Sequence, residues 1–433
     1  MDELAIKGGP KVRTEKFPAY TVIGQEEKDA LCNVVDSGVL SAYLGAWHKK
    51  FNGGEQVLAL EEEWAAFFGC KHAIAVNSNT SGLIAAMGAI GLSPGDEVIV
   101  SAYSMTISAS APLFYGAIPV FADIDPDTFC LSPESVERQI TPRTKAIIVV
   151  DIFGHPYAVD EINALAKKNN LFVIEDAAQA PGAKVGEQFA GRFGDVGVFS
   201  LNYHKHIHCG EGGMIVTDHD ELADNIRLIR NHAEAVVGAK QHKTLVNMVG
   251  YNFRMTEMEA AVARCQLRKL PALLDARIKN ALYLSDGLSE IEGIIPPKIL
   301  SNVKHVFYVQ GFKFEADKVG VFRDVFIEAV KAELPVMTLR EDEGVLIGCG
   351  YVRPLYLQPL YQEKIAFGKN GYPFVLANPS VSYHQGLCEV VEQMHFCDLF
   401  TLDLCHGFMT TKDLDDIIRA FKKVYALRYS LGD

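Results

Sequence analysis

The sequence predicts an α/β fold with a large, mainly parallel sheet and a smaller C-terminal α+β domain. Between about residues 70 and 217, short apolar runs alternate with helical stretches, which is typical of strands that crossover helices bury on both faces. From about residue 266 a long helical stretch leads into a different mixture of helices and one strand. We therefore expect an N-terminal arm and a large domain in residues 1–265, and a small α+β domain in residues 266–433.

Seven β-branched or wholly apolar runs are the expected strands of the large sheet. Amphipathic helical stretches, Ser81–Ile90 and Asp160–Lys168, lie between the earlier runs. Only residues 202–212 separate the last two runs, which is too short for a crossover helix, so one of these strands is expected to run antiparallel. The expected strands are Ala73–Val76, Glu97–Val100, Pro119–Asp123, Ala146–Asp151, Phe172–Asp176, Val196–Leu201 and Gly213–Thr217.

In the C-terminal part, the sequence predicts three helices and a strand. Thr410 and Asp413 have the spacing of a capping box ahead of the last helix. The stretch Gly348–Tyr372 is rich in glycine and aromatic residues without periodicity, and we expect it to be a loop. The expected elements are the helices Gln266–Leu284, Arg323–Glu333 and Lys412–Tyr425 and a strand within residues 307–314.

Composition and charge exclude several classes of protein. Hydrophobic residues make up 49% of the 433 residues and aromatic residues 10%, which excludes a disordered chain and provides for a large core. The 41 basic and 54 acidic residues give a net charge of −13 with no basic block. This charge argues against nucleic acid or an anionic membrane surface as a partner.

The chain is expected to work in the cytoplasm. Its first residues lack the basic-then-apolar order of a signal peptide, and no apolar run reaches the roughly 18 residues of a spanning helix. The nine cysteines are scattered and lack CxxC spacing. The sequence therefore predicts neither a disulfide framework nor a structural zinc site.

Polar residues gather where the predicted strands end, which is the edge where open parallel sheets bind ligands. The first cluster, Asn77–Ser81, lies between a strand and a helix, so its backbone N–H groups and hydroxyls suit a phosphate. An ordinary strand–helix turn is the alternative. The cluster matches neither a Walker loop nor a GxGxxG fingerprint, so neither ATP nor NAD is expected.

The second and third clusters carry a carboxylate and a lysine. Asp176 follows a strand among apolar neighbours and suits a cationic ring nitrogen, although Asp is also a common helix N-cap. Lys205 lies between His204 and His206, and a lysine that bonds an aldehyde must lose its proton through desolvation or nearby positive charge. A surface lysine and a metal site built with His208 are the alternatives, but no carboxylate has ligand spacing.

Together the three clusters predict a site for pyridoxal phosphate. The aldehyde of this cofactor requires a lysine, its ring nitrogen requires a carboxylate and its phosphate requires hydrogen-bond donors. All three would lie at the same edge of the sheet. No metal is expected in this site.

The chain resembles the DegT/DnrJ/StrS family, the sugar aminotransferases among fold-type I pyridoxal-phosphate enzymes. The resemblance extends along most of the chain, and its opening LAIKGGPKVR is similar to the cyclitol and aminoshikimate-type branch. The most specific motifs are VIEDAAQAPGA (173–183), FGDVGVFSLNYHKHIHCGEGG (193–213), IRNHA (229–233) and GYNFRMTEMEAA (250–261).

The resemblance implies a role for each matching residue. Lys205 would bind the cofactor covalently, Asp176 would pair with its ring nitrogen and Gln179 would contact its ring hydroxyl. Asn252 would reach the phosphate of the neighbouring subunit, which implies a homodimer with shared active sites. The remaining residues would bind the phosphate (Thr80, Ser81, Ser200) or the substrate (His232, Arg353, Tyr356).

The sequence departs from the family pattern at three places. Met105 stands where the family has a stacking Phe or Trp, and Tyr103 is an alternative stacking residue. Asn79-Thr80 replaces the common Gly-Thr turn, and Asn tolerates positive φ. Segment 41–57 is longer than in typical members and is expected to shape the substrate pocket.

The resemblance implies amino transfer from L-glutamate or L-glutamine to a keto sugar. The opening motif and segment 41–57 favour an acceptor without a nucleotide, such as a 3,8-dideoxy-8-oxo-octulosonate for lipopolysaccharide or a keto-inositol; a nucleotide-linked keto-deoxysugar is the alternative. Sugar 3-dehydratases carry His in place of the lysine, but counting back from Gly210 places Lys205 there. A non-catalytic cofactor-binding regulator would have no need of the full residue set.

Overall fold

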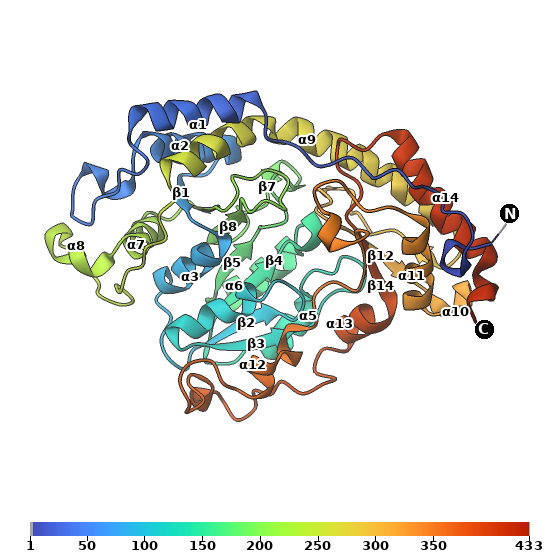
Figure 1. The fold of residues 1–433 in the computed structure, drawn as a ribbon. Coiled ribbons are helices and arrows are strands. Elements are labelled where there is room, and N and C mark those ends of the chain that lie inside the picture. Colours follow the sequence, from blue (N-terminus) through green and yellow to red (C-terminus); the bar gives the residue numbers. More distant parts are fainter. Residues whose placement is uncertain (1–2, 433) are drawn as a thin grey trace.

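The computed structural model describes residues 3–432 and has a seven-stranded sheet at the centre of a large domain (Figure 1). The strand order is β1-β9-β8-β5-β4-β2-β3. Strands β8, β5, β4, β2 and β3 run parallel to one another, and β9 pairs antiparallel with both β1 and β8. All seven expected strands are confirmed, including the antiparallel one. They are β1 His72–Val76, β2 Glu97–Ser101, β3 Ile118–Ala122, β4 Thr144–Val150, β5 Phe172–Asp176, β8 Val196–Ser200 and β9 Gly213–Thr217.

Helices cover both faces of this sheet, as the alternation of side chains in β1 illustrates. Ile74 and Val76 pack into one core cluster with helix α3, whereas Ala73 and Ala75 pack into a second cluster with helices α2 and α9 (Glu257–Ser289). The helices of the large domain are α1 Gln25–Ser37, α2 Glu55–Phe68, α3 Asn79–Ala89, α4 Ile107–Ser110, α5 Pro133–Gln139, α6 Val159–Asn169, α7 Asp220–Arg230 and α8 Ala233–Lys240.

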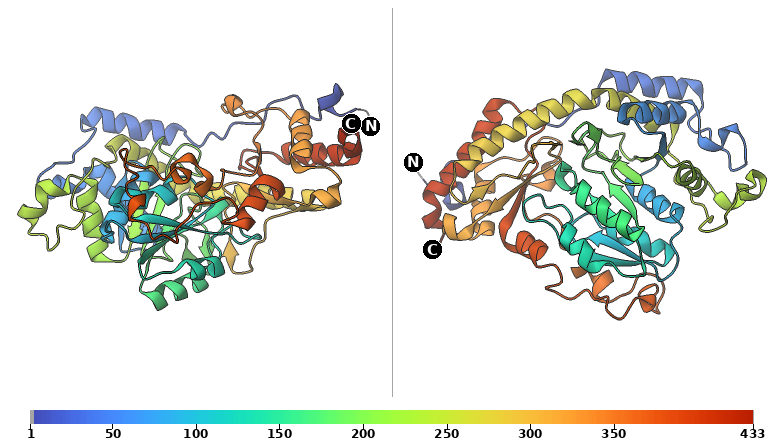
Figure 2. Two further views of the ribbon diagram at one scale, coloured as in Figure 1. Left: turned by 90° about the horizontal axis from the view of Figure 1, so that it is seen from below. Right: turned by 180° about the vertical axis from the view of Figure 1, so that it is seen from behind.

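Helix α9 (Glu257–Ser289) connects the large domain to the small one (Figures 1 and 2). It begins at a capping box formed by Thr256 and Glu259, and it is longer at both ends than the expected helix. Its first turns pack against α1 and α2, and its later turns pack against α14 (Thr411–Leu427). A single long helix therefore fixes the small domain relative to the edge of the sheet.

The small domain has a four-stranded antiparallel sheet in the order β10-β12-β14-β13. The expected helix Arg323–Glu333 and the capping box of Thr410 and Asp413 are confirmed. The elements are β10 Ile294–Ile295, β12 Gln310–Phe314, β13 Ile347–Cys349, β14 Leu399–Leu402, α10 Ala316–Val319, α11 Arg323–Glu333 and α14 Thr411–Leu427. A separate three-stranded sheet, β11-β6-β7, consists of β6 Lys184–Val185, β7 Gln188–Phe189 and β11 Val303–Lys304.

The expected division has a single boundary at 265/266, which lies inside α9. In the structure the chain crosses between the two domains more than once. At the N-terminus, Leu4 and Phe17 pack in the core of the small domain. Near the C-terminus, Tyr356 and Tyr361 return to the core of the large domain. The arm and this returning segment lie beside elements distant in sequence in Figures 1 and 2.

The expected loop over Gly348–Tyr372 is confirmed for most of its residues, but short regular elements interrupt it. This stretch contains the end of β13 and the short helix α12 (Pro359–Gln362), and α13 (Glu389–Gln393) follows it. Buried aromatic anchors such as Tyr361 hold it against Phe121 of β3. These anchors follow no helix or strand period, which is why periodicity did not indicate them.

Within residues 3–432, no helix combines the length and apolarity needed to cross a bilayer.

Candidate active site

A cavity of about 400 Å³ opens at the carboxyl edge of the large sheet, between the two domains. Its volume is within the range of small-molecule sites, roughly 300–1,000 Å³. It brings together six of the predicted residues, which lie at the ends of four strands or in the segments that follow them: Thr80, Met105, Asp176, Gln179, Ser200 and Lys205.

Lys205 lies in a tight turn after β8, where its backbone N–H donates to the Asn202 carbonyl at 2.9 Å. The residue is only 8% exposed, and its Nζ lies 4.2 Å from the ring centroid of Tyr308. Burial lowers the pKa of Lys205 to about 8, although Asp176 and Asp403 oppose this shift. A buried lysine with this pKa is unprotonated in a useful fraction near neutral pH, as nucleophilic amine chemistry requires.

Asp176 is the last residue of β5, and its carboxylate is buried at the bottom of the cavity. Ser108 Oγ donates to its Oδ2 at 2.6 Å, and Asn79 Nδ2 and the Ala178 N–H each donate to its Oδ1 at 3.2 Å. Burial raises the pKa of Asp176, and these donors and Lys205 oppose the rise. Within residues 3–432 no ion pair to this carboxylate is found, so a cationic ligand would complete its surroundings.

Gln179 is held by two hydrogen bonds at the cavity wall. Its Oε1 accepts from the Phe153 N–H at 2.7 Å, and its Nε2 donates to the Tyr351 hydroxyl at 3.0 Å. Phe153 has a left-handed backbone with φ of 58°, a conformation that is uncommon in a residue with a side chain. The amide of Gln179 is therefore fixed from both domains.

The N-terminus of α3 lines the cavity with Ser78, Asn79 and Thr80, opposite Ser200. Helix N-termini of this kind bind phosphate through free N–H groups and hydroxyls. Ser81 does not line the cavity. Its N–H donates to Oγ of Ser78, the N-cap of the helix, at 3.1 Å, and its hydroxyl donates to Asn77 Oδ1 at 2.5 Å. Ser78 lines the cavity where Ser81 does not, and the phosphate contact of Ser81 stays a prediction.

Met105, not Tyr103, lies at the cavity. Met105 is 50% exposed and lines the wall, in keeping with the position where the family has an aromatic residue. Tyr103 is fully buried, and its hydroxyl accepts from the Tyr351 N–H at 2.7 Å. The alternative of Tyr103 as the stacking residue is wrong because its ring is occupied in holding the Tyr351 segment.

Tyr356 is not a pocket residue in this structure. Its side chain is fully buried in the core of the large domain, where its hydroxyl contacts Glu392 and its ring packs on Phe121. Arg353 is exposed and also lies outside the lining of the cavity. The tyrosines that line the cavity are Tyr203, Tyr308 and Tyr351, which the sequence prediction missed.

His232, Asn252 and the long segment 41–57 form a separate surface, away from this cavity. Asn231 pairs with Asn252 in a β-bridge and donates from its Nδ2 to the Leu44 carbonyl at 3.0 Å. Asn252 Oδ1 accepts from Arg254 Nε at 2.8 Å. Segment 41–57 thus packs on the turns that carry the two predicted residues and not on the cavity of its own chain.

The three alternating histidines do not form a metal site. Burial lowers the pKa of His206 to about 3, so its ring is neutral and its Nε2–H donates to the Val306 carbonyl at 3.0 Å. His204 instead lies 3.7 Å from Glu343. Across residues 3–432, no group of three or more metal-binding side chains has a suitable arrangement.

The residues of the cavity fit pyridoxal phosphate. An amine of lowered pKa, a buried carboxylate without a cationic partner and a hydroxyl-rich helix N-terminus match the aldehyde, ring nitrogen and phosphate of this cofactor. The backbone behind the helix N-terminus is closely packed. A Cβ on Gly213 would lie 2.6 Å from the carbonyl carbon of Ser78, so glycine lets β9 approach this turn.

Residues 41–374 match the model of the DegT/DnrJ/EryC1/StrS aminotransferase family. The chain is 31% identical over 410 residues to the spore coat polysaccharide biosynthesis protein SpsC of Bacillus subtilis, covering 93% of this chain and 95% of SpsC. DesV of S. venezuelae, solved in complex with a ketimine intermediate, has a TM-score of 0.74 at 29% identity and covers 92% of this chain and 94% of its own.

A third similar structure is DesI, solved in the presence of its TDP-sugar product. It has a TM-score of 0.79 at 26% identity and covers 99% of both chains. The fold, the cavity and these similarities agree. The chain belongs to the DegT/DnrJ/EryC1/StrS aminotransferase family and is a pyridoxal-phosphate-dependent aminotransferase of sugar biosynthesis.

Proposed function

We propose that the enzyme transfers an amino group from L-glutamate or L-glutamine to a keto sugar, with Lys205 as its catalytic residue. The observation that carries this proposal is the convergence of Lys205, Asp176 and the Ser78–Thr80 turn on one cavity. Lys205 is buried and has a lowered pKa, so it can accept the α-proton of the donor and return it to a neighbouring carbon.

The other residues bind and orient the cofactor. Asp176 pairs with the ring nitrogen, Gln179 contacts the ring hydroxyl, and Ser78, Thr80 and Ser200 hold the phosphate. Met105 covers one face of the ring, since a thioether packs favourably against an aromatic system. Bound pyridoxal phosphate supplies an electron sink for the pair released when the α-proton leaves.

The active site is shared between two copies of the chain in this proposal. His232, Asn252 and segment 41–57 lie on one surface, away from the cavity of their own chain. Exposed apolar residues of the neighbouring loop, Leu245 and Val249, are 73% and 71% exposed. Exposed apolar side chains beside candidate site residues support a homodimer in which Asn252 reaches the phosphate of the partner subunit.

The acceptor is a keto sugar that enters beside Lys205. A second cavity of about 350 Å³ shares His204, Tyr308 and Tyr351 with the first and so extends the available space. A non-nucleotide acceptor, a keto-inositol or an 8-oxo-octulosonate of lipopolysaccharide synthesis, is our first candidate. The similarity to DesI, whose structure holds a TDP-sugar, favours a nucleotide-linked keto-deoxysugar as the second.

We assign the reaction to the cytoplasm, because all nine cysteines are unpaired within residues 3–432.

The proposed amino transfer is tested by the visible spectrum of the purified enzyme before and after the donor is added. A yellow band that L-glutamate or L-glutamine bleaches, and that a keto-inositol or a TDP-linked keto-deoxyhexose then restores, supports the proposal and distinguishes the two acceptor classes. An enzyme that binds the cofactor but responds to neither donor contradicts it.

A further inference from the structure

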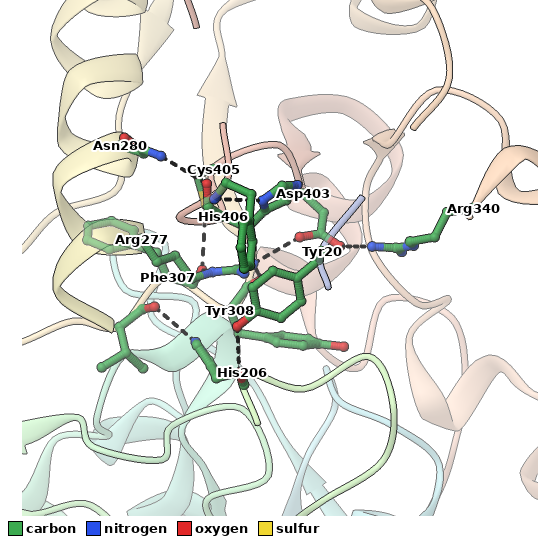
Figure 3. Close-up of polar contacts among 12 residues, drawn as sticks. Tyr20, His206, Arg277, Asn280, Phe307, Tyr308, Arg340, Asp403, Cys405 and His406 are labelled. Carbon is green, nitrogen blue, oxygen red and sulfur yellow. Dashed lines mark hydrogen bonds and ion pairs between the residues drawn. The ribbon is translucent and has the colours of Figure 1, made fainter. Parts of the chain in front are cut away.

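A buried polar network connects the small domain to the turn that carries Lys205 (Figure 3). On the large-domain side, the Tyr20 hydroxyl of the N-terminal arm donates to the His206 carbonyl at 2.5 Å. The His206 ring in turn donates from Nε2 to the Val306 carbonyl at 3.0 Å. The residue after Lys205 is thus held from two directions, by the arm and by the small domain.

On the small-domain side, Arg277 of α9 holds the backbone that carries Tyr308. Its Nε donates to the Phe307 carbonyl and its Nη2 donates to the Tyr308 carbonyl, both at 2.6 Å. Phe307 has a left-handed backbone with φ of 50°, and such a conformation persists only where surrounding contacts enforce it. Arg277 is one of these contacts, and the Tyr308 ring it positions lies 4.2 Å from Lys205 Nζ.

Asp403 lies between two arginines at the end of this network. Its Oδ1 is 2.9 Å from Arg277 Nη2, and its Oδ2 is 2.6 Å from Arg340 Nη1 (Figure 3). Although burial favours its neutral form, the two guanidinium groups hold the pKa of Asp403 below its ordinary value. Asp403 is therefore an anion, and its charge acts on Lys205 together with that of Asp176.

We propose that Arg277 and Asp403 are positioning residues for Lys205, holding the Tyr308 ring beneath the lysine amine and supplying a second carboxylate charge beside that of Asp176. This inference rests on the proposed role of Lys205. It assigns a function to a cluster that would otherwise serve only to join the two domains. Acting through Tyr308 and through charge, neither residue has to touch the cofactor.

The other groups around the lysine do not account for the same effect. His204 and His206 have pKa values lowered by burial, so both are neutral near pH 7. Burial raises the pKa values of Tyr308 and Tyr351, which also stay neutral. The remaining charged groups are Asp176 and Glu211 of the cavity, Arg277 and Arg340 of the network, and Glu343, which pairs with Arg340.

The test measures the protonation of the Lys205 amine directly, in the cofactor-free enzyme. Isotope-labelled acetic anhydride is applied at a series of pH values, and the Lys205 peptide is quantified by mass spectrometry. Asp403→Asn removes an anion, so the amine should lose its proton more easily and react about threefold faster at pH 7. Arg340→Gln leaves Asp403 less neutralised, so the amine should react about threefold more slowly.

The labelling rate of Lys205 should change in opposite directions in the two variants, which distinguishes this proposal from simple loosening of the structure. Loosening would move both variants toward the slow reaction of a solvated lysine, and that result would overturn the proposal, as would no change in either variant. Asp324→Asn, which changes an exposed partner of Arg323 in the same domain, is the matched control. If Asp403→Asn does not fold, Arg340→Gln still tests the proposal, because labelling of Lys205 that is unchanged or faster in this variant would overturn it.

The two proposals can fail separately. If the labelling shifts occur as expected but the cofactor does not attach to Lys205, the network is real and the proposed function is wrong. If the cofactor attaches to Lys205 and both variants label like the wild type, the proposed function stands and the positioning role of Asp403 is wrong.

Discussion

Ser108 Oγ lies 2.6 Å from Asp176 Oδ2 and donates a hydrogen bond to it inside the buried floor of the cavity. Because the pKa of Asp176 is raised by burial, each donor helps to keep the carboxylate ionised. Ser108 in turn is in contact with Ser104, whose hydroxyl lies 2.8 Å from its own. Ser108 of α4, in contact with Ser104 of the turn after β2, therefore tunes a carboxylate at the end of β5.

Replacing Ser108 by Ala should weaken cofactor binding by about tenfold. A hydrogen bond to a charged group contributes roughly 1.5–3 kcal/mol, and part of this is recovered when Asp176 pairs with the ring nitrogen. The measurement is equilibrium titration of the cofactor-free enzyme, followed by absorbance. Ser110→Ala, on the same helix α4 but without a bond to Asp176, should bind normally. Equal affinities for the two variants would contradict this role.

Replacing Gly213 by Ala should disturb the phosphate turn. The added Cβ would lie 2.6 Å from the Ser78 carbonyl carbon and 2.8 Å from the Asn79 nitrogen, and both are backbone atoms that cannot rotate away. Overpacking of this kind costs roughly 1–3 kcal/mol, so both the melting temperature and the cofactor affinity should fall.

Gly238→Ala is the matched control for Gly213, since nothing lies within 4 Å of the added Cβ on helix α8. An added methyl group there should leave stability equal or slightly raised, because alanine favours a helix over glycine by about 1 kcal/mol. A Gly213→Ala enzyme as stable as this control would show that the turn after β1 has room to move.

The rate at which the cofactor-free enzyme binds pyridoxal phosphate should depend on pH, with a midpoint near pH 8. Burial lowers the pKa of Lys205 to about 8, so below this pH the amine carries its proton and cannot attack an aldehyde. The initial loading rate should rise about tenfold per pH unit below the midpoint and level off above it. Stopped-flow absorbance provides the measurement. A rate that still rises steeply from pH 9 to pH 10 would mean that Lys205 is solvated.

Mixing two inactive variants should restore activity if the sites are shared. In a mixed dimer of Lys205→Ala and Asn252→Ala chains, one site carries both changes and the other carries neither. Equal mixing gives one intact site in half of the dimers, or about a quarter of wild-type activity. Activity that stays at the level of the separate variants after subunit exchange would contradict a shared site.

Much of the fold can be predicted from the sequence, because its strands and their connections are marked by residues that are neighbours in the chain. Runs such as 146–150 (AIIVV) are apolar at every position, which is typical of a strand buried on both faces. The short span between Leu201 and Gly213 left no room for a helix and so indicated the antiparallel β9. The ends of the strands then placed Asp176 and Lys205 at one edge.

The remainder of the site depends on contacts between distant segments. Tyr308 and Tyr351 reach the cavity from the small domain, and nothing in their neighbouring residues indicates it. Tyr103 and Tyr356 have the composition of pocket residues, but the fold buries them in hydrogen bonds to Tyr351 and Glu392. Aromatic residues in non-periodic stretches can serve either role, and only tertiary packing decides which.

The most direct test of the account is to locate the cofactor on the chain. The loaded enzyme is reduced with sodium borohydride, digested and analysed by peptide mass spectrometry. The account predicts the added mass of the reduced cofactor on Lys205 alone, and no added mass in the Lys205→Ala variant, whose circular dichroism should match that of the wild type. Attachment to another lysine, or no attachment in an enzyme that aminates a keto sugar, would contradict it.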